Sequence, residues 1–213
     1  MSDDRALRQG WRGISLKAAA LLGWVTLGTQ LYQNCQDAGS LLGGLNVFLS
    51  YFTVLSNILV TLVLTSAATV GESSAGRFLL RPSVQGGAVV SVVLVSFVYN
   101  LLLRVPWSAQ EFQWVPDELM HDVMPVLFLL YWWFYVTKGG LQWRDMLPWL
   151  IYLLAYCIYV LLRGYLIGAY PYDFTDVGAL GYPQVLINAG MVVLGFMLVS
   201  LLVIAVDRWQ GQR

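Results

Sequence analysis

DELMHDVMPVLFLLYWWFYV, residues 117–136, is a largely apolar stretch that is long enough to cross a lipid bilayer as a helix. His121, the only histidine of the chain, stands near its start. An ionisable side chain inside a membrane is costly, so by default it marks a functional site. Pro125 follows one turn later and has no N–H to donate to the carbonyl of His121. We therefore predict that the helix kinks or opens at the histidine.

The composition of the whole chain favours an integral membrane protein. Of its 213 residues, 58% are hydrophobic and only 11% are charged, whereas soluble domains average roughly 25% charged residues. This shortfall of charge is explained if most of the surface faces lipid. The formal net charge is zero, which provides no electrostatic reason to expect a nucleic-acid partner.

Six stretches are long and apolar enough to span a membrane. We predict an all-α integral membrane protein, a six-helix bundle that forms a single polytopic domain over residues 1–213. The predicted spans cover residues 14–33, 45–69, 85–104, 117–137, 147–167 and 184–206. The first is too long for the apolar part of a signal peptide and has no small-residue cleavage site after it, so we expect it to be retained. The fifth contains Gly164 and Gly168, a small-residue pair that predicts close packing of helices.

The basic residues indicate how the spans are oriented. Ten of the twelve lysines and arginines lie in the N-terminal segment, in the loops after the second and fourth spans, and in the C-terminal tail. By the positive-inside rule these segments, and with them both termini, face the cytoplasm. The two exceptions, Arg104 and Arg163, lie toward the outer face. Each either snorkels to the interface or points inward and holds an anion.

Polar residues at helical spacing predict a shared interior. In the second span, polar side chains follow one another at steps of four, three, four and four, and so share one helix face. They are Asn46, Ser50, Thr53, Asn57 and Thr61. In lipid, such a face must meet protein or water. Under the predicted topology the outer half of the bundle contains Thr53, Asn57, Asn100, Arg104, His121, Asp122, Arg163 and Asn188. We therefore expect a polar cavity that opens toward the outer leaflet.

The residue types in this cavity support two mechanisms. In the first, His121 acts as a general base for a hydroxyl nucleophile, with Thr53 as the candidate. An acid one turn earlier, Asp117 or Glu118, then orients the imidazole. In the second, His121 and the acids move protons beside a substrate path.

Asp122 is a weaker candidate for orienting the imidazole, because adjacent residues on a helix do not face each other. We expect it to pair with Arg104 or Arg163 instead. No metal or cofactor site is expected, since the chain has one histidine, no cysteine pair at ligand spacing and no glycine-rich phosphate loop. Cys35 and Cys157 fall at different depths, so we predict that they are unpaired.

Four strings of the chain together resemble the bacterial six-helix membrane family called Pr6Pr. They are FLSYFTVLSN (48–57), LMHDVMPVLFLLYWW (119–133), YVLLRGYLIGAYPYDF (159–174) and LGYPQVLIN (180–188). The likeness extends over most of the chain, from the first span to the sixth. It implies a multi-pass protein of the plasma membrane, which in bacteria is the inner membrane.

More distantly, the chain resembles the androgen-induced and tissue-factor-regulating membrane proteins of animals. Those are threonine hydrolases that split fatty acid esters of hydroxy fatty acids. Thr53 in SYFTVL matches the position of their threonine, and His121 in MHDVMP matches that of their histidine. The spacing from histidine to proline is one residue shorter here, and Asp122 stands where those proteins have a hydroxyl residue. The resemblance implies that Thr53 is a nucleophile and His121 its base.

The leading hypothesis is therefore a hydrolase of lipid esters, whose partners are membrane lipids, a lipid ester or a fatty acid, with no nucleic acid and no metal. Predicted substrate-binding residues are Asn57, Asn100, Arg104, Asp122, Arg163 and Asn188. One alternative is a small transporter or lipid-binding protein that uses the same cavity. Another is a structural or regulatory membrane protein without a ligand.

Overall fold

The computed structural model describes residues 2–69, 73–104 and 114–213, and side chains from residue 10 onward except that of residue 114. The described residues form helices and connections, with no β-strand among them, so the predicted all-α class is confirmed for this part of the chain. The α-helices are α1 (Ser2–Ala38), α2 (Leu41–Phe48), α3 (Phe52–Ala68), α4 (Ser74–Leu79), α5 (Pro82–Val98), α6 (Trp114–Glu118), α7 (Met124–Tyr135), α8 (Met146–Ile167) and α9 (Val177–Gly211). Two π-helical segments, η1 (Tyr99–Leu103) and η2 (Leu119–Val123), and two 3₁₀ turns, η3 (Trp143–Asp145) and η4 (Asp173–Thr175), lie between them.

Several of these helices are suited to crossing a membrane. Four stretches are long and apolar enough, namely Gly10–Ala38, Pro82–Leu103, Trp143–Ile167 and Val177–Gly211, and the bent pair α2 and α3 would add a fifth. The predicted span 117–137 is helical through α6, η2 and α7 but is not among these candidates. His121 and three acids lower the hydropathy of its first half. The structure is thus compatible with a multi-pass membrane protein, and six spans stay a prediction.

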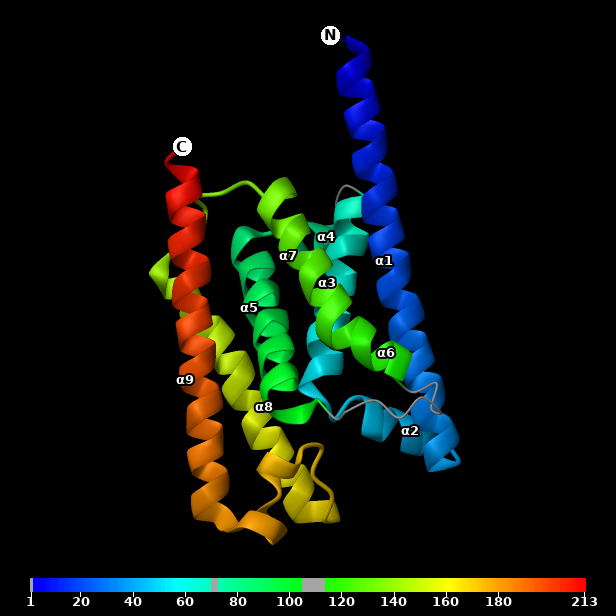
Figure 1. Ribbon diagram of the computed structural model, residues 1–213, viewed down its shortest axis with the longest axis vertical. Coiled ribbons are helices and arrows are strands. Elements are labelled where there is room, and N and C mark those ends of the chain that lie inside the picture. Colours follow the sequence, from blue (N-terminus) through cyan, green and yellow to red (C-terminus); the bar gives the residue numbers. More distant parts are fainter. Residues whose placement is uncertain (1, 70–72, 105–113) are drawn as a thin grey trace.

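Both ends of the chain lie at the same end of the helical bundle, as the blue and red ribbons of Figure 1 show. An even number of membrane crossings would place both ends of the chain on the same side of the membrane. The assignment of this end to the cytoplasm stays a prediction from the basic residues.

Helix α5 lies in the middle of the bundle and packs against α3, α7 and α9 (Figure 1). Val89 and Val90 of α5 are fully buried, as are Val63 and Leu64 of α3 and Phe128 of α7, and all five belong to one apolar core. This packing sets the position of α3, which carries Thr53, relative to η2 and α7.

The predicted second span, residues 45–69, does not form one straight helix. It breaks at residues 49–51 into α2 and α3, which meet at 87°. Distant side chains satisfy the backbone groups that the break releases: the hydroxyl of Tyr156 donates to the carbonyl of Ser50 at 2.8 Å, and the N–H of Phe52 donates to the hydroxyl of Tyr172 at 3.1 Å. The predicted polar stripe is therefore interrupted, and Thr53 becomes the second residue of α3.

We predicted that the helix kinks or opens at His121, and it opens there. The segment η2 is π-helical, and the N–H of Met124 donates to the carbonyl of Leu119, five residues earlier. Pro125 removes a helical donor at this point, and π-bulges occur frequently at functional sites. The end of α5 widens in the same way in η1, where the N–H of Arg104 donates to the carbonyl of Tyr99.

The loop between α8 and α9, residues 168–176, folds back onto α8. Gly168 ends α8 in the left-handed region, at a φ of 69°, which glycine adopts without steric cost. The ring of Tyr170 then lies against Gly164, where a Cβ would stand 1.9 Å from a ring carbon. The two glycines therefore do not serve the helix packing that their spacing predicted. One receives a loop tyrosine, and the other ends the helix.

Substituting Gly164 tests this contact. We expect Gly164→Ala to lower the free energy of unfolding by about 1–3 kcal/mol, because overpacking forces the Tyr170 ring and its loop to move. Gly190→Ala is the control, since a Cβ there has open space and alanine favours the helix by about 1 kcal/mol. Thermal unfolding of both variants in detergent measures the effect, and equal stability of the two would contradict it.

Candidate functional site

The side chains of Thr53 and His121 meet in the interior of the bundle. Thr53 belongs to the first turn of α3 and His121 to η2, and their side chains approach to 3.2 Å between Oγ1 and Nε2. Both residues are buried, with exposed fractions of 6% and 8%. The structure therefore brings together the two residues that the sequence predicted as nucleophile and base, although 68 positions separate them along the chain.

The surroundings of His121 determine which ring nitrogen carries the proton. Its Nδ1 lies 2.8 Å from the carbonyl oxygen of Asp117 and 3.0 Å from a carboxylate oxygen of the same residue. Both are acceptors, so a neutral imidazole holds its proton on Nδ1. The Nε2 atom then presents a lone pair to the hydroxyl of Thr53. This is the tautomer that a general base requires.

Asp117 is the acid that contacts the imidazole, and of the two predicted candidates it is the one in this position. Its other carboxylate oxygen accepts a hydrogen bond of 2.5 Å from the hydroxyl of Tyr99. The ring of Tyr99 also stacks on the ring of His121, with 3.9 Å between centroids and 14° between planes. Tyr99 thus holds the imidazole by its face and the orienting acid by its hydroxyl. Tyr99 is not among the site residues that the sequence predicted.

Thr53 also lies at the positive end of a helix dipole. The first backbone N–H groups of a helix have no partner within it, and they favour negative charge nearby. Here the N–H groups of Phe52 and Thr53 point to the hydroxyl oxygen of Tyr172, at 3.1 and 3.5 Å. Tyr172 comes from the α8–α9 loop and was not predicted as a site residue. No local pattern could have revealed it, because the contact depends on the fold of that loop.

Asn57 joins the two segments that carry Thr53 and His121. Its side-chain amide donates to the carbonyl of Thr53 at 2.9 Å, within α3, and to the carbonyl of Met120 at 3.2 Å, within η2. The residue is buried, and it does not line the cavities beside Thr53. Its contacts are those of a tether between the two segments rather than of a residue that touches a substrate.

Two cavities of different character meet at Thr53 and His121. The first has a volume of about 730 Å³, counting the space at its opening. Its walls are mainly aliphatic and aromatic side chains of α5, α8 and α9, such as Val95, Leu153 and Val192. The second has a volume of about 800 Å³, counting the space at its opening, and the polar residues Gln30, Asn34 and Asp117 are among those that line it. Thr53, Leu103, His121 and Tyr172 line both. The reactive pair therefore lies at a boundary between an apolar cavity and a polar one.

Three predicted substrate-binding residues form a separate polar cluster on the π-helical segments. Arg104 pairs with Glu118, at 3.0 Å, and with Asp122, and Asn100 donates to Asp122 at 2.8 Å. The predicted pairing of Asp122 with an arginine is confirmed. None of Asn100, Arg104 and Asp122 lines either cavity at Thr53. The cluster joins η1 to α6 and η2.

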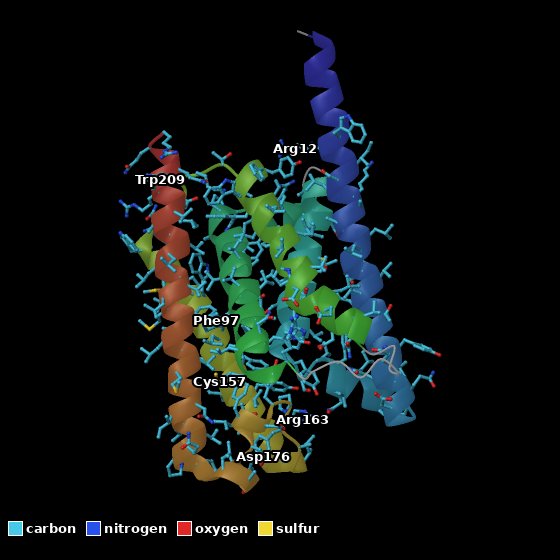
Figure 2. All side chains as sticks on the ribbon, in the orientation of Figure 1. Arg12, Phe97, Cys157, Arg163, Asp176 and Trp209 are labelled. Atoms are coloured by element: carbon cyan, nitrogen blue, oxygen red, sulfur yellow. The ribbon has the colours of Figure 1, made fainter. Side chains whose placement is uncertain are left out.

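The remaining two predicted residues stabilise the α8–α9 loop. Arg163, labelled in Figure 2 close to this loop, donates to the carbonyl of Ala169 at 2.5 Å and to the side chain of Asn46 at 2.9 Å. Asn188 of α9 donates to the carbonyl of Phe174 at 2.9 Å. Both residues therefore bind groups of the protein itself: Arg163 binds a backbone carbonyl and a side chain, and Asn188 binds a backbone carbonyl.

No family model, no curated protein and no solved structure matches the chain. Among the described residues, no group of three or more histidine, cysteine, aspartate or glutamate side chains gathers to hold a metal ion. Cys35 and Cys157 are free thiols, as predicted. The described site brings together a hydroxyl, an imidazole and a carboxylate.

The tether role of Asn57 can be tested by removing its amide. We expect Asn57→Leu to lower the free energy of unfolding by about 1–2 kcal/mol, since it leaves the carbonyl of Met120 without its donor. Ser91→Ala is a control, because Ser91 is equally buried but bonds only to Gly87 of its own helix. Denaturant unfolding in detergent measures both. If Asn57→Leu costs no more than Ser91→Ala, Asn57 is not a tether.

Proposed function

We propose that this protein hydrolyses lipid esters in the membrane, with Thr53 as the nucleophile, His121 as the general base and Asp117 as the residue that orients the imidazole. One observation carries the proposal: the contacts from Asp117 through His121 to Thr53 end at a boundary between an apolar and a polar cavity. The resemblance of Thr53 and His121 to the residues of animal threonine hydrolases points to the same chemistry.

In the proposed reaction, the Oγ1 atom of Thr53 attacks the ester carbonyl while its proton moves to Nε2 of His121. The tetrahedral intermediate collapses as the bond from the carbonyl carbon to the alcohol oxygen breaks. The leaving oxygen receives the proton from Nε2, which leaves an acyl group on Thr53. A water molecule then attacks the acyl carbonyl and gives a proton to Nε2 of His121. The bond to Oγ1 of Thr53 breaks, Oγ1 takes the proton back from Nε2, and the fatty acid is released.

Asp117 contributes by holding the imidazole and by stabilising the imidazolium that forms during each step. The hydrogen bond from Tyr99 to the second oxygen of Asp117 keeps the carboxylate in this orientation. The N-terminus of α3 and the hydroxyl of Tyr172 lie next to Thr53 and favour negative charge there. We assign the developing oxyanion to this end of the site.

The two cavities suit the two halves of a lipid ester. An acyl chain matches the apolar walls of the first cavity, and an ester oxygen and a polar leaving group match the second. A proton shuttle for transport would gain little from an apolar cavity on one side of the histidine. In this proposal the six spans are retained, with both termini in the cytoplasm and the site in the outer half of the plasma membrane.

A short-chain fluorophosphonate probe that captures activated hydroxyl groups tests the proposal. We expect wild-type protein in detergent to be labelled at Thr53, and Thr53→Ala to abolish labelling. His121→Ala and Asp117→Asn should slow it by about 10²–10⁴-fold, the usual contribution of acid–base catalysis. Thr69→Ala is the matched control, because this hydroxyl ends the same helix and lies outside both cavities.

The unfolding temperature of each variant shows whether it is folded. Thr53→Ser should restore labelling, since serine supplies a hydroxyl at the same position. If folded wild-type protein is not labelled while a serine hydrolase in the same detergent is, the proposal is wrong and the cavities serve binding or transport instead. Equal labelling of wild type and Thr53→Ala would also contradict it.

A further inference from the structure

A third hollow lies between the end of α5 and α9, on the outside of the bundle. Its volume is about 740 Å³, counting the space at its opening. Its rim is formed by Phe97, Leu101 and Leu102 of α5 and η1, and by Met191 of α9. These four side chains are 59–66% exposed, and Figure 2 shows Phe97 on the side of α5 that faces α9. We call this hollow the acyl groove.

The acyl groove adjoins the apolar cavity that reaches Thr53. Leu94, Val98, Phe174 and Val192 line both. These four side chains therefore form the boundary between the outer surface of the bundle and the interior cavity. A molecule that lies in the groove and passes them reaches the reactive pair without crossing a polar region.

Phe174 occupies a supported position at this boundary. Its ring stacks on the ring of Tyr172, with 5.2 Å between centroids and 7° between planes, and the hydroxyl of Tyr172 contacts the N-terminus of α3. On the other side, its carbonyl accepts the hydrogen bond from Asn188 of α9. Asn188, Phe174 and Tyr172 thus connect the groove and its boundary to the first turn of α3.

The groove offers little to a polar ligand. Asn188 is the only residue among those lining it whose side chain has hydrogen-bonding atoms. Its amide group donates to Phe174, and its carbonyl oxygen accepts from Gln184 at 2.9 Å. Buried polar groups without partners are costly, so a ligand rich in such groups would bind poorly here. An aliphatic chain has no such groups.

We propose that the acyl groove is the binding site through which the acyl chain of a membrane lipid enters the apolar cavity directly from the bilayer, with Phe174 at the threshold. The inference rests on the proposed function in one respect: the lipid whose chain enters the cavity is the ester that Thr53 hydrolyses. Binding of the chain does not require turnover, so the two proposals can fail separately.

Filling the groove tests the inference. Met191→Trp and Phe97→Trp place a bulky side chain at opposite walls of the rim. Leu198→Trp is the matched control, because Leu198 is exposed on α9 to a similar extent and lies outside the groove. A fatty acid with a diazirine on its chain is crosslinked to Thr53→Ala protein in phosphatidylcholine vesicles. We expect crosslinks to groove residues, reduced roughly tenfold by either groove substitution and unchanged by the control.

Turnover is measured in proteins that retain Thr53. We expect the groove substitutions to raise the KM for a long-chain ester roughly tenfold while labelling by the short fluorophosphonate stays at the wild-type rate. Normal labelling with an unchanged KM and unchanged crosslinking would overturn the groove and leave the hydrolase proposal standing. No labelling of wild type, with crosslinking that the groove substitutions still reduce, would overturn hydrolysis and leave the groove as a lipid-binding site. Crosslinking that is equally reduced by Leu198→Trp would overturn the groove as a specific site.

Discussion

Every backbone N–H and C=O group that loses its helical partner inside a membrane must find another within the protein. This constraint organises the centre of the molecule. The helices are interrupted between α2 and α3, at η2 and in the α8–α9 loop, and at each interruption a side chain reaches the freed group. At the α2–α3 break, Tyr156 donates to Ser50 and Tyr172 accepts from Phe52. At η2, Asn57 donates to Met120, and in the α8–α9 loop Arg163 donates to Ala169. The candidate site stands where these interruptions meet.

The same interruptions give the site its electrostatic character. The bend before Phe52 turns the positive end of α3 toward the interior, next to Thr53. The π-helical segments place Tyr99 against His121 and Arg104 beside Asp122. A carboxylate, an imidazole and a hydroxyl are thus aligned where the apolar cavity meets the polar one. Arg104 forms its ion pairs with Glu118 and Asp122, while Asp117 pairs with His121.

The shape of the bundle separates two environments around one reactive pair. Aliphatic walls from α5, α8 and α9 bound one side, while Gln30 and Asn34 of α1 border the other. A lipid ester has the same division between its chain and its polar group. The acyl groove extends the apolar side to the outer surface, so that a lipid would need only to slide between α5 and η1 on one side and α9 on the other.

Local sequence patterns determined the helical class, the apolar stretches, the opening at Pro125, the pairing of Asp122 with an arginine, and the choice of Thr53 and His121. These features depend on residues within one or two turns of each other, or on residue types that are rare in apolar helices. The tertiary structure alone decided that Thr53 touches His121, that Asp117 rather than Glu118 holds the imidazole, and that Tyr172 reaches α3. It also decided that Asn57 and Arg163 bind the protein's own groups. Such contacts join residues far apart in the chain, and they depend on where helices break, which hydropathy averaged over a span does not record.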